Sequence, residues 1–438
     1  MKKEKSNKQK ILNFFKKNKI QWNFSDSYKD YIKAFIQEMN WGLAGKESSL
    51  AMLPSYIKPG FKVPIKEKTI VLDAGGTNIR TALISFNNKG GHKLHYYKKT
   101  LLPGAAKEIS KNKFFEEIYK LIEPIIDKSN KIGFCFSYPM EKTKDCDGRV
   151  LAMSKEMQSG RHLIGQKIGE NLKKTLKAKG LKKKFKVVLL NDTVATLLAG
   201  NLIGQVRRYK NYAGVIWGTG INACYIEKNE NIKKIKQKIG SQIINTEFGN
   251  FDKFQKSKFD KALDKKTQNQ GFQHFEKMVA GAYFGSLCLE VLKQAAKENV
   301  FSKKTAVYVI ALNELLTKDV NNFIINPFEP NNPLGQKSVK KTDKETIFYI
   351  LSLLIERSIW LMAISIASVV LKTGDGLNPL HPLCINLDGY TVHAMKGLKG
   401  RLENRLYKLL TKKRDIYFEI IQIDHSPLIG AGIAGLVN

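Results

Sequence analysis

Short apolar runs alternate with longer amphipathic stretches along most of the chain. The segment Thr69 to Phe86, TIVLDAGGTNIRTALISF, predicts a strand, a glycine turn and a second strand. Amphipathic helices are predicted at 114–128 and 163–179, with a strand at 131–140 between them. The run VVLLNDTVATLLAG (187–200) adds a buried strand followed by a helix. This alternation is typical of an α/β protein with a mixed sheet.

The same layout returns in the second half of the chain. AGVIWGTGINACYIE (213–227) repeats the strand, glycine turn and strand of the first half. The remaining predicted elements are long helices at about 272–298 and 343–371, a strand at 383–389, a basic helix at 394–412, a strand at 416–423 and a glycine-rich helix at 428–437. We therefore expect two related α/β halves. Sheets of this kind bind ligands at strand ends that face the crevice between the halves.

Four segments lie outside this alternation. We interpret residues 1–20 as a mobile or weakly helical basic arm. Residues 26–52 carry a helical pattern, and the Pro/Gly-containing stretch at 53–64 ends it and predicts a hinge or linker. The polar run at 252–271 predicts a surface loop.

Size and charge limit the possible partners. The chain has 438 residues and 43% hydrophobic content, which allows two or three domains at about 100–200 residues each. Its formal net charge is +35, and only nine of the 74 basic residues are arginines. Arginine supplies most bidentate contacts to nucleic acids, so we expect no specific nucleic-acid partner. The charge indicates either attraction for an anionic substrate or the solvated surface of a lysine-biased chain.

The cysteine, histidine and apolar patterns argue against several classes of protein. Five scattered cysteines without a C-x-x-C pair, and seven histidines without a cluster, indicate neither a disulfide framework nor a structural zinc site. The N-terminus lacks the apolar core of a signal peptide, and the longest apolar run (359–371) is too short to span a bilayer. We expect a cytoplasmic protein without a transmembrane segment.

Two glycine turns are candidates for anion binding. DAGGTN (Asp73 to Asn78) and WGTGIN (Trp217 to Asn222) each lie between two strands, where glycines let backbone N–H groups approach an anion. Either turn alone fits an ordinary hairpin, but two of them, each opening one half, favour phosphate binding. A dinucleotide fingerprint is rejected because a strand, not a helix, follows the second turn.

Asp192 ends the buried strand at 187–190, and the residues alone leave two roles open for it. An aspartate before TVATLL is a good helix N-cap. A carboxylate at a strand tip that faces a cleft is also a candidate proton acceptor.

Eight sequence blocks occur in the order found in hexokinases, the ATP-dependent sugar kinases. They are LDAGGTNIR, FSYP, SKEM, LLNDTVATLLAG, GTGINACYIE, INTEFGNF, GFQHFEKMVAG and LDG. From about residue 69 to its C-terminus the chain therefore resembles the hexokinase family, and within it the eukaryotic-type hexokinases and glucokinases. The resemblance implies a two-lobed α/β fold of the actin-like ATPase (ribonuclease H-like) type. In that fold, mixed sheets are flanked by helices and the ligand cleft lies between a small and a large domain.

The resemblance also suggests five parts of the chain. They are a basic arm (1–20), an N-terminal helix and linker that pack on the large domain (21–66), the small domain (67–205) and the large domain (206–425). A C-terminal helix (426–438) then returns to the small domain.

The resemblance assigns roles around a hexose. Asp192 matches the catalytic base that takes the proton from the sugar 6-hydroxyl as that oxygen attacks the γ-phosphoryl group of ATP. Lys155 matches a catalytic and hexose-binding residue that also neutralises charge on the transferred group. The other implied hexose contacts are Ser137, Ser154 (in place of the usual threonine), Asn191, Asn222, Glu247, Gln273 and Glu276. Amides and carboxylates of this kind suit a polyol, since each hydroxyl both donates and accepts.

ATP and Mg²⁺ are the implied cofactors. Asp73 matches the carboxylate that organises Mg²⁺ through water. The implied phosphate loops and adenosine-side positions are Gly75, Gly76, Thr77, Asn78, Arg80, Gly218, Thr219, Gly220, Asp388, Gly389, Gly430 and Gly432.

Four positions depart from the pattern of the family. Glu156 makes the sugar loop more charged, Asn250 replaces a frequent alanine, Phe272 a frequent glutamine and Tyr390 a frequent serine. We expect these departures to change sugar preference and nucleotide affinity rather than to abolish activity.

The predicted function is that of a hexokinase or glucokinase acting at the first step of glycolysis on glucose or a related hexose with Mg-ATP. The alternative is a non-catalytic, hexokinase-like sugar sensor or regulatory protein. A third interpretation is that the positive surface docks to an anionic membrane or to nucleic acid. The sequence leaves open the preferred hexose and whether the protein is a monomer or a homodimer.

Overall fold

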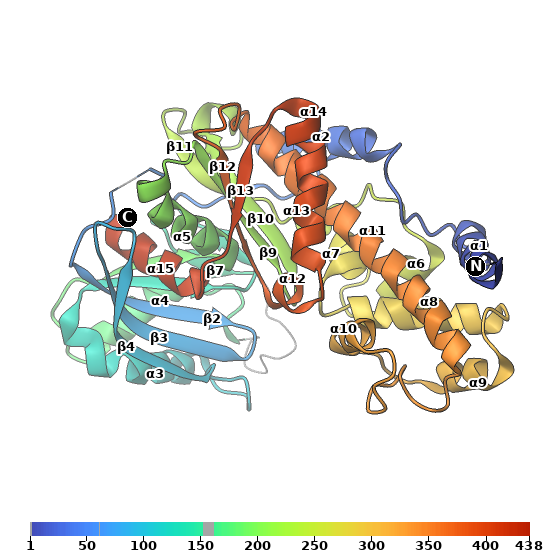
Figure 1. Ribbon diagram of the computed structural model, residues 1–438. Helices are drawn as coiled ribbons and strands as arrows, with labels where there is room; N and C mark the ends of the chain where they lie inside the picture. Colours follow the sequence, from blue (N-terminus) through green and yellow to red (C-terminus); the bar gives the residue numbers. More distant parts are fainter. Residues whose placement is uncertain (1, 61, 152–161) are drawn as a thin grey trace.

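Two large β-sheets organise the computed structural model, which describes residues 2–60, 62–151 and 162–438 (Figure 1). The smaller sheet has the order β4-β3-β2-β5-β8. Its strands are β2 Lys68–Gly75, β3 Asn78–Phe86, β4 His92–Leu101, β5 Lys131–Phe136 and β8 Lys186–Leu190. Strands β2, β5 and β8 are parallel, whereas β3 and β4 are antiparallel to their neighbours. The sheet is therefore mixed, as the sequence pattern predicts.

The larger sheet has the order β1-β11-β10-β9-β12-β13. Its strands are β1 Leu53–Pro54, β9 Asn211–Trp217, β10 Ile221–Lys228, β11 Ser241–Asn245, β12 Leu383–Asp388 and β13 Phe418–Ile421. Strands β9, β12 and β13 are parallel, and β10 folds back on β9 through the second glycine turn. A short hairpin of β6 Met140–Lys142 and β7 Gly148–Val150 forms a separate two-stranded sheet.

Helices cover both sheets. They are α1 Lys2–Lys17, α2 Tyr28–Ala44, α3 Lys111–Ile122, α4 Ile168–Ala178, α5 Asp192–Arg207, α6 Lys258–Lys266, α7 His274–Val279, α8 Phe284–Lys297, α9 Lys303–Ala311, α10 Thr317–Ile325, α11 Lys341–Thr373, α12 Tyr390–Ala394, α13 Leu398–Leu409, α14 Thr411–Arg414 and α15 Ser426–Val437. Helix α15 packs on β2, β5 and β8, and helix α5 packs on β9, β10 and β12. The two helices also contact each other, so they form a layer between the sheets (Figure 1).

Helix α11 is the long central helix of the larger lobe. Its most apolar 18-residue window has a mean hydropathy of 1.8, and among the described residues it alone is long and apolar enough to cross a membrane. However, 72% of that window is buried inside the protein, where α11 packs against α2, α13 and β10. This burial is what a central core helix requires.

Residues 1–20 and the polar run at 252–271 each contain a helix. Residues 1–20 contain α1, whose Ile11, Phe14 and Phe15 are buried in the core of the larger lobe. The polar run at 252–271 contains α6, which begins with a capping box of Ser257 and Asp260. For residues 1–20, the helical alternative of the prediction is confirmed and the mobile one is wrong, and the prediction of a surface loop at 252–271 is wrong. In each case a few spaced apolar residues among many lysines are enough to bury one helix face.

The prediction of one helix at 272–298 is also wrong, because this segment forms two helices. Helix α7 ends at Val279 and α8 begins at Phe284. In the break, the N–H groups of Gly281 and Ala282 donate to the carbonyls of Gly218 (2.8 Å) and Thr219 (3.0 Å). The backbone therefore leaves the helix to support the second glycine turn. The segment at 53–64, which was predicted to be a hinge or linker, begins with strand β1, and β1 pairs with β11.

Candidate active site

The opening of helix α5 settles which residue caps it. The carbonyl of Asn191 accepts from the Ala195 N–H (3.0 Å), and Oδ1 of Asn191 accepts from the Thr193 N–H (2.9 Å). Asn191 is therefore the N-cap, and Asp192 is the first helical residue. Oδ1 of Asp192 accepts from the same N–H (2.8 Å) and from the Thr193 hydroxyl (3.3 Å). Because Asn191 already caps the helix, capping does not explain why an aspartate is present at position 192.

The environment of Asp192 prepares it to exchange a proton near neutral pH. Burial raises the pKa of the Asp192 carboxyl to about 6. Hydrogen bonds from Thr193 and from the Ser137 hydroxyl oppose this rise in pKa, and the nearby charge of Asp73 adds to it. Ser137 follows β5, and its N–H donates to the carbonyl of Ala74 in β2 (3.0 Å). A carboxyl group with this pKa suits a general base.

A network of amides and carboxylates faces Asp192 from the larger sheet. Oε1 of Glu247 accepts from Nδ2 of Asn245 (2.7 Å) and from Nδ2 of Asn222 (3.3 Å). Asn222 Nδ2 also donates to Asn245 Oδ1 (2.8 Å). Burial raises the pKa of Glu247, and the charge of Asp192 raises it further. This electrostatic coupling indicates that the side chains of the two lobes share one site.

Glu276 belongs to the same cluster and touches the second glycine turn. Its Oε2 accepts from the N–H of Ile221 (2.9 Å). A Cβ on Gly220 would lie 2.8 Å from that oxygen, so glycine is needed for the carboxylate to reach the turn. Burial raises the pKa of Glu276 to about 7, and the charges of Glu247 and Asp192 contribute to the rise. The predicted hexose site and the predicted phosphate loop are therefore contiguous.

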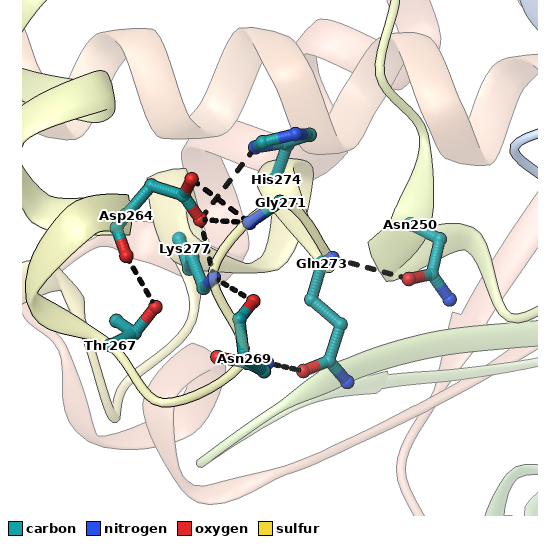
Figure 2. Close-up of polar contacts among 8 residues, drawn as sticks. All are labelled: Asn250, Asp264, Thr267, Asn269, Gly271, Gln273, His274 and Lys277. Atoms are coloured by element: carbon teal, nitrogen blue, oxygen red, sulfur yellow. Dashed lines mark hydrogen bonds and ion pairs between the residues drawn. The ribbon is translucent and has the colours of Figure 1, made fainter.

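Gln273 and Glu247 both adopt backbone conformations that are unusual for residues with a side chain. Their φ angles are +53° and +54°, and each residue precedes a short helix. The N–H of Gln273 donates to Oδ1 of Asn250 (3.2 Å) and its Oε1 accepts from Nδ2 of Asn269 (Figure 2). Strained residues of this kind persist where the surrounding structure holds them, and they cluster at binding sites.

The first glycine turn connects β2 to β3, with Gly75 paired to Asn78 and with Gly76 and Thr77 at its tip. The carbonyl of Thr77 accepts from the N–H of Leu102 (2.9 Å), which ties the turn to the end of β4. Nearby, Oδ2 of the buried Asp73 accepts from Nη1 of Arg80 (2.6 Å).

The second glycine turn is held by one internal hydrogen bond and by the segment that follows β12. The N–H of Gly218 donates to the carbonyl of Gly220 (2.9 Å), and the Thr391 hydroxyl donates to the carbonyl of Gly218 (2.7 Å). Gly389 follows Asp388 at the end of β12 and has a φ of +121°. A Cβ there would lie 2.4 Å from the carbonyl carbon of Trp217, so only glycine allows this approach. The turn, including Thr219, is thereby fixed beside Asp388.

The residues present fit a magnesium–nucleotide complex. Mg²⁺ keeps several waters and takes one or two carboxylates together with phosphate oxygens, so it needs no dense cluster of protein ligands. Among the described residues, no group of three or more histidine, cysteine, aspartate or glutamate side chains is arranged so that it could hold a metal ion by itself. Asp73 sits beside the first glycine turn and Asp388 beside the second. Both are therefore suited to a hydrated ion between the two turns.

Four predicted site residues are not placed at the site by a contact among the described residues. Ser154 and Lys155 lie outside the described residues. Gly430 and Gly432 are buried within α15. A Cβ on Gly430 would lie 1.9 Å from the carbonyl oxygen of Ala195, and one on Gly432 would lie 2.7 Å from Cγ2 of Ile84. Close packing of α15 on α5 and on β3 explains these two glycines, and their role beside adenine stays a prediction.

Two residues of the hydrogen-bond network, Asn245 and Asn269, were not predicted from the sequence. Asn245 ends β11 two residues before Glu247 and supplies its shortest hydrogen bond. Glu247 lies beyond the end of β11 and has a φ of +54°, so the alternation of side chains along a strand could not have placed it beside Asn245. Asn269 lies in the run predicted to be a surface loop, so no local pattern pointed to it.

Comparisons with known proteins agree with this geometry. Family models described as hexokinase match residues 19–202 and 212–437. Glucokinase-1 of Kluyveromyces lactis is 27% identical over 420 residues, which cover 85% of this chain and 86% of that protein. Hexokinase-5 of Oryza sativa subsp. japonica is 27% identical over 420 residues, which cover 86% of this chain and 80% of that protein.

Solved structures show the same fold. A hexokinase from Schistosoma mansoni, complexed with glucose, superposes with a TM-score of 0.78 at 21% identity and covers 99% of each chain. A second hexokinase structure also gives a TM-score of 0.78, at 22% identity, and covers 98% of this chain and all of that one. The predicted two-lobed, actin-like fold is thus confirmed.

Proposed function

The chain belongs to the hexokinase family of ATP-dependent sugar kinases, and from this premise we propose that it transfers the γ-phosphoryl group of ATP to the 6-hydroxyl of glucose or a related hexose. One observation carries the proposal. The carboxyl group of Asp192, with its pKa raised by burial to about 6, interacts electrostatically with the carboxylates of Glu247, which follows β11, and of Glu276 in α7. A proton acceptor therefore faces groups that bind hydroxyls.

In this proposal Asp192 accepts the proton of the 6-hydroxyl as the oxygen attacks phosphorus. Phosphoryl transfer needs alignment, charge neutralisation and a positioned proton acceptor more than it needs covalent chemistry. The Thr193 N–H and hydroxyl hold Oδ1 of Asp192, which fixes the direction of the carboxylate. The resemblance adds Lys155 beside the transferred group.

The other polar residues bind and orient the hexose. Glu247 and Glu276 accept hydrogen bonds from sugar hydroxyls, while the amides of Asn191, Asn222 and Gln273 complete the ring of partners. Ser137 contributes its hydroxyl from the small lobe, and Ser154 belongs to the same set by resemblance. Because these groups come from both lobes, a bound hexose is held between them, and closure around it excludes water as a competing acceptor.

The two glycine turns hold the phosphates of the nucleotide. Backbone N–H groups of the turns after β2 and after β9 approach an anion without obstruction from side chains. Asp73 is buried and paired with Arg80, so its carboxylate is fixed in direction and can hold the water shell of an ion. Mg²⁺, when bound, supplies neutralisation of phosphate charge.

A substrate panel tests the proposal. Purified protein is assayed with Mg-ATP and glucose, mannose, fructose or glucosamine, with ADP release coupled to NADH oxidation. We expect turnover with at least one hexose. Binding of glucose by calorimetry without any turnover across the panel would instead support the sugar-sensor alternative.

A further inference from the structure

A buried ion pair lies directly behind the predicted hexose site. Nζ of Lys277 is 2.6 Å from Oδ1 of Asp264, and the two side chains are only 2% and 12% exposed (Figure 2). Asp264 also accepts from the N–H of Gly271 (3.0 Å). Lys277 is the neighbour of Glu276 in α7, so the pair joins the segment at 252–271 to a helix of the site. This segment is therefore part of the framework of the site.

The ion pair anchors Asn269. Nζ of Lys277 donates to the carbonyl of Asn269 (2.8 Å), and Nδ2 of Asn269 donates to Oε1 of Gln273. The carbonyl of Gln273 in turn accepts from the N–H of Lys277 (3.0 Å). These three contacts close a ring through Lys277, Asn269 and Gln273. The position of Asn269 thus depends on a charge that is shielded from water.

Gln273 has one hydrogen-bonding group left for a ligand. Its N–H donates to Asn250 (3.2 Å), its carbonyl accepts from Lys277 and its Oε1 accepts from Asn269. Among the described residues no partner is found for Nε2, and Figure 2 shows this nitrogen turned away from Asn269. A primary amide has a donor end and an acceptor end, so occupying the acceptor end leaves the donor end to face a ligand.

Resting on the function proposed above, we propose that Asn269, anchored by the Lys277–Asp264 ion pair, is a positioning residue that sets the amide orientation of Gln273. Gln273 then presents N–H donors to an oxygen of the hexose that accepts a hydrogen bond. Glu247 and Glu276 as carboxylates only accept hydrogen bonds. The site therefore distinguishes sugar oxygens by the direction of their hydrogen bonds, with Asn269 setting that direction at one of them.

A role limited to folding stability makes a different prediction. If Asn269 and the ion pair only stabilise the loop, substitutions there lower the unfolding temperature and leave the KM for hexose unchanged. If Asn269 sets the orientation of the Gln273 amide, a substitution of equal size at position 269 raises the KM for hexose and leaves the KM for ATP unchanged. The two KM values therefore separate the roles.

The main variant is Asn269→Asp, which keeps the shape of the side chain but removes its donor. A carboxylate only accepts, so Gln273 turns its Nε2 toward position 269 and presents Oε1 to the hexose. We expect the KM for hexose to rise about tenfold or more, because a substrate oxygen and the amide oxygen then face each other without a shared hydrogen. The KM for ATP stays at the wild-type value.

A second variant guards against a folding defect in the first. Gln273→Glu keeps an acceptor for Asn269 and replaces the free amide donor by an oxygen, so it is expected to raise the KM for hexose in the same way. In addition, Asn269→Ala in a Gln273→Ala background should raise the KM no further than Gln273→Ala alone. That result is the signature of a residue that acts through another.

The matched control is Thr267→Val. The Thr267 hydroxyl donates to the carbonyl of Asp264 (2.7 Å) in the same segment, but it does not reach Gln273. We expect a wild-type KM for hexose in this variant.

The inference is overturned if folded Asn269→Asp and Gln273→Glu both keep the wild-type KM, or if the two alanine substitutions are additive. Neither outcome affects the proposed function, which fails only if the wild-type protein phosphorylates no hexose. In that case hexose affinities from calorimetry replace the KM values in the same comparisons.

Discussion

The two sides of the candidate hexose site use carboxylates in different ways. On the side of the smaller sheet, Asp192 stands at the first turn of a helix and its partners are Thr193 and the hydroxyl of Ser137. On the side of the larger sheet, Glu247 accepts from two amides and Glu276 accepts from a backbone N–H. The first arrangement holds one acid at the start of a helix, whereas the second builds a fixed network around several acceptors.

Burial alone does not tell the two sides apart. It raises the pKa of Glu276 to about 7, which is above the value of about 6 for Asp192. A raised pKa therefore marks the whole site rather than the base. What distinguishes Asp192 is its hydrogen bond from Ser137, which lies against Gly75 of the first glycine turn. The comparison teaches that position selects the base and that desolvation prepares the entire cluster.

The largest expected effect separates catalysis from binding. Asp192→Ala should lower kcat by about 10²–10⁴, the usual contribution of a general base. Hexose binding should persist, because the network on the larger sheet remains intact. A coupled assay measures kcat and calorimetry measures binding. Turnover near the wild-type rate would return Asp192 to a structural role.

A second substitution tests the opposite side. Glu247→Ala removes the acceptor of the amide groups of Asn222 and Asn245, and buried donors without a partner are costly. We expect the KM for hexose to rise about 10–100-fold, with a smaller change in kcat. The exposed Glu403 provides a control, since Glu403→Ala should leave both constants unchanged. A loss confined to kcat would contradict the division of roles.

The pH dependence of kcat/KM sharpens the same comparison. A base must be ionised to accept a proton, so kcat/KM should fall as pH drops below the Asp192 pKa of about 6, approaching about tenfold per pH unit. This acid limb should remain in Glu276→Gln, whose carboxyl has the higher pKa of about 7 in the wild type. Disappearance of the limb in Glu276→Gln would instead identify Glu276 as the base.

The last expected effect is on stability rather than on activity. Burial raises the folded pKa of Asp192 from 3.8 to about 6, so the folded state binds this proton more tightly than the unfolded state. Stability from this group is present below pH 3.8 and is lost as pH rises to about 6. Asp192→Asn should therefore increase the free energy of unfolding by about 3 kcal/mol at neutral pH, because the pKa is higher in the folded state by about two units, at about 1.4 kcal/mol each.

Urea titrations near pH 4 and at pH 7 check this last prediction. The stabilisation should be small at the lower pH, where the wild-type carboxyl is itself protonated in the folded state. An equal effect at both values of pH would show that charge burial is not its cause.

Much of the fold could be predicted from local patterns. Both glycine hairpins and the strand and helix around Asp192 were predicted at the correct places, and Figure 1 shows the sheets that they build. These elements depend on hydrophobic period and on glycine at a turn, which are properties of neighbouring residues. The eight family blocks then supplied the candidate residues, including Glu247 and Glu276.

The tertiary structure decided what distant residues do for one another. Arg357 pairs with Asp260 (2.8 Å) and Lys277 with Asp264, which turns a polar run into a buried framework. The helix predicted at 272–298 breaks because Gly281 is needed by a turn far away in the sequence. Asn269 contacts Gln273 through its side chain and Lys277 through its carbonyl.

The physical reason is the range of the interactions. Backbone preference and amphipathic period act over a few residues, so the sequence alone determined the elements and the motif positions. Desolvation and ion pairing depend on which segments meet in space. Only the tertiary structure therefore decided that Asp192 has a raised pKa and that a lysine-rich run supports the binding site.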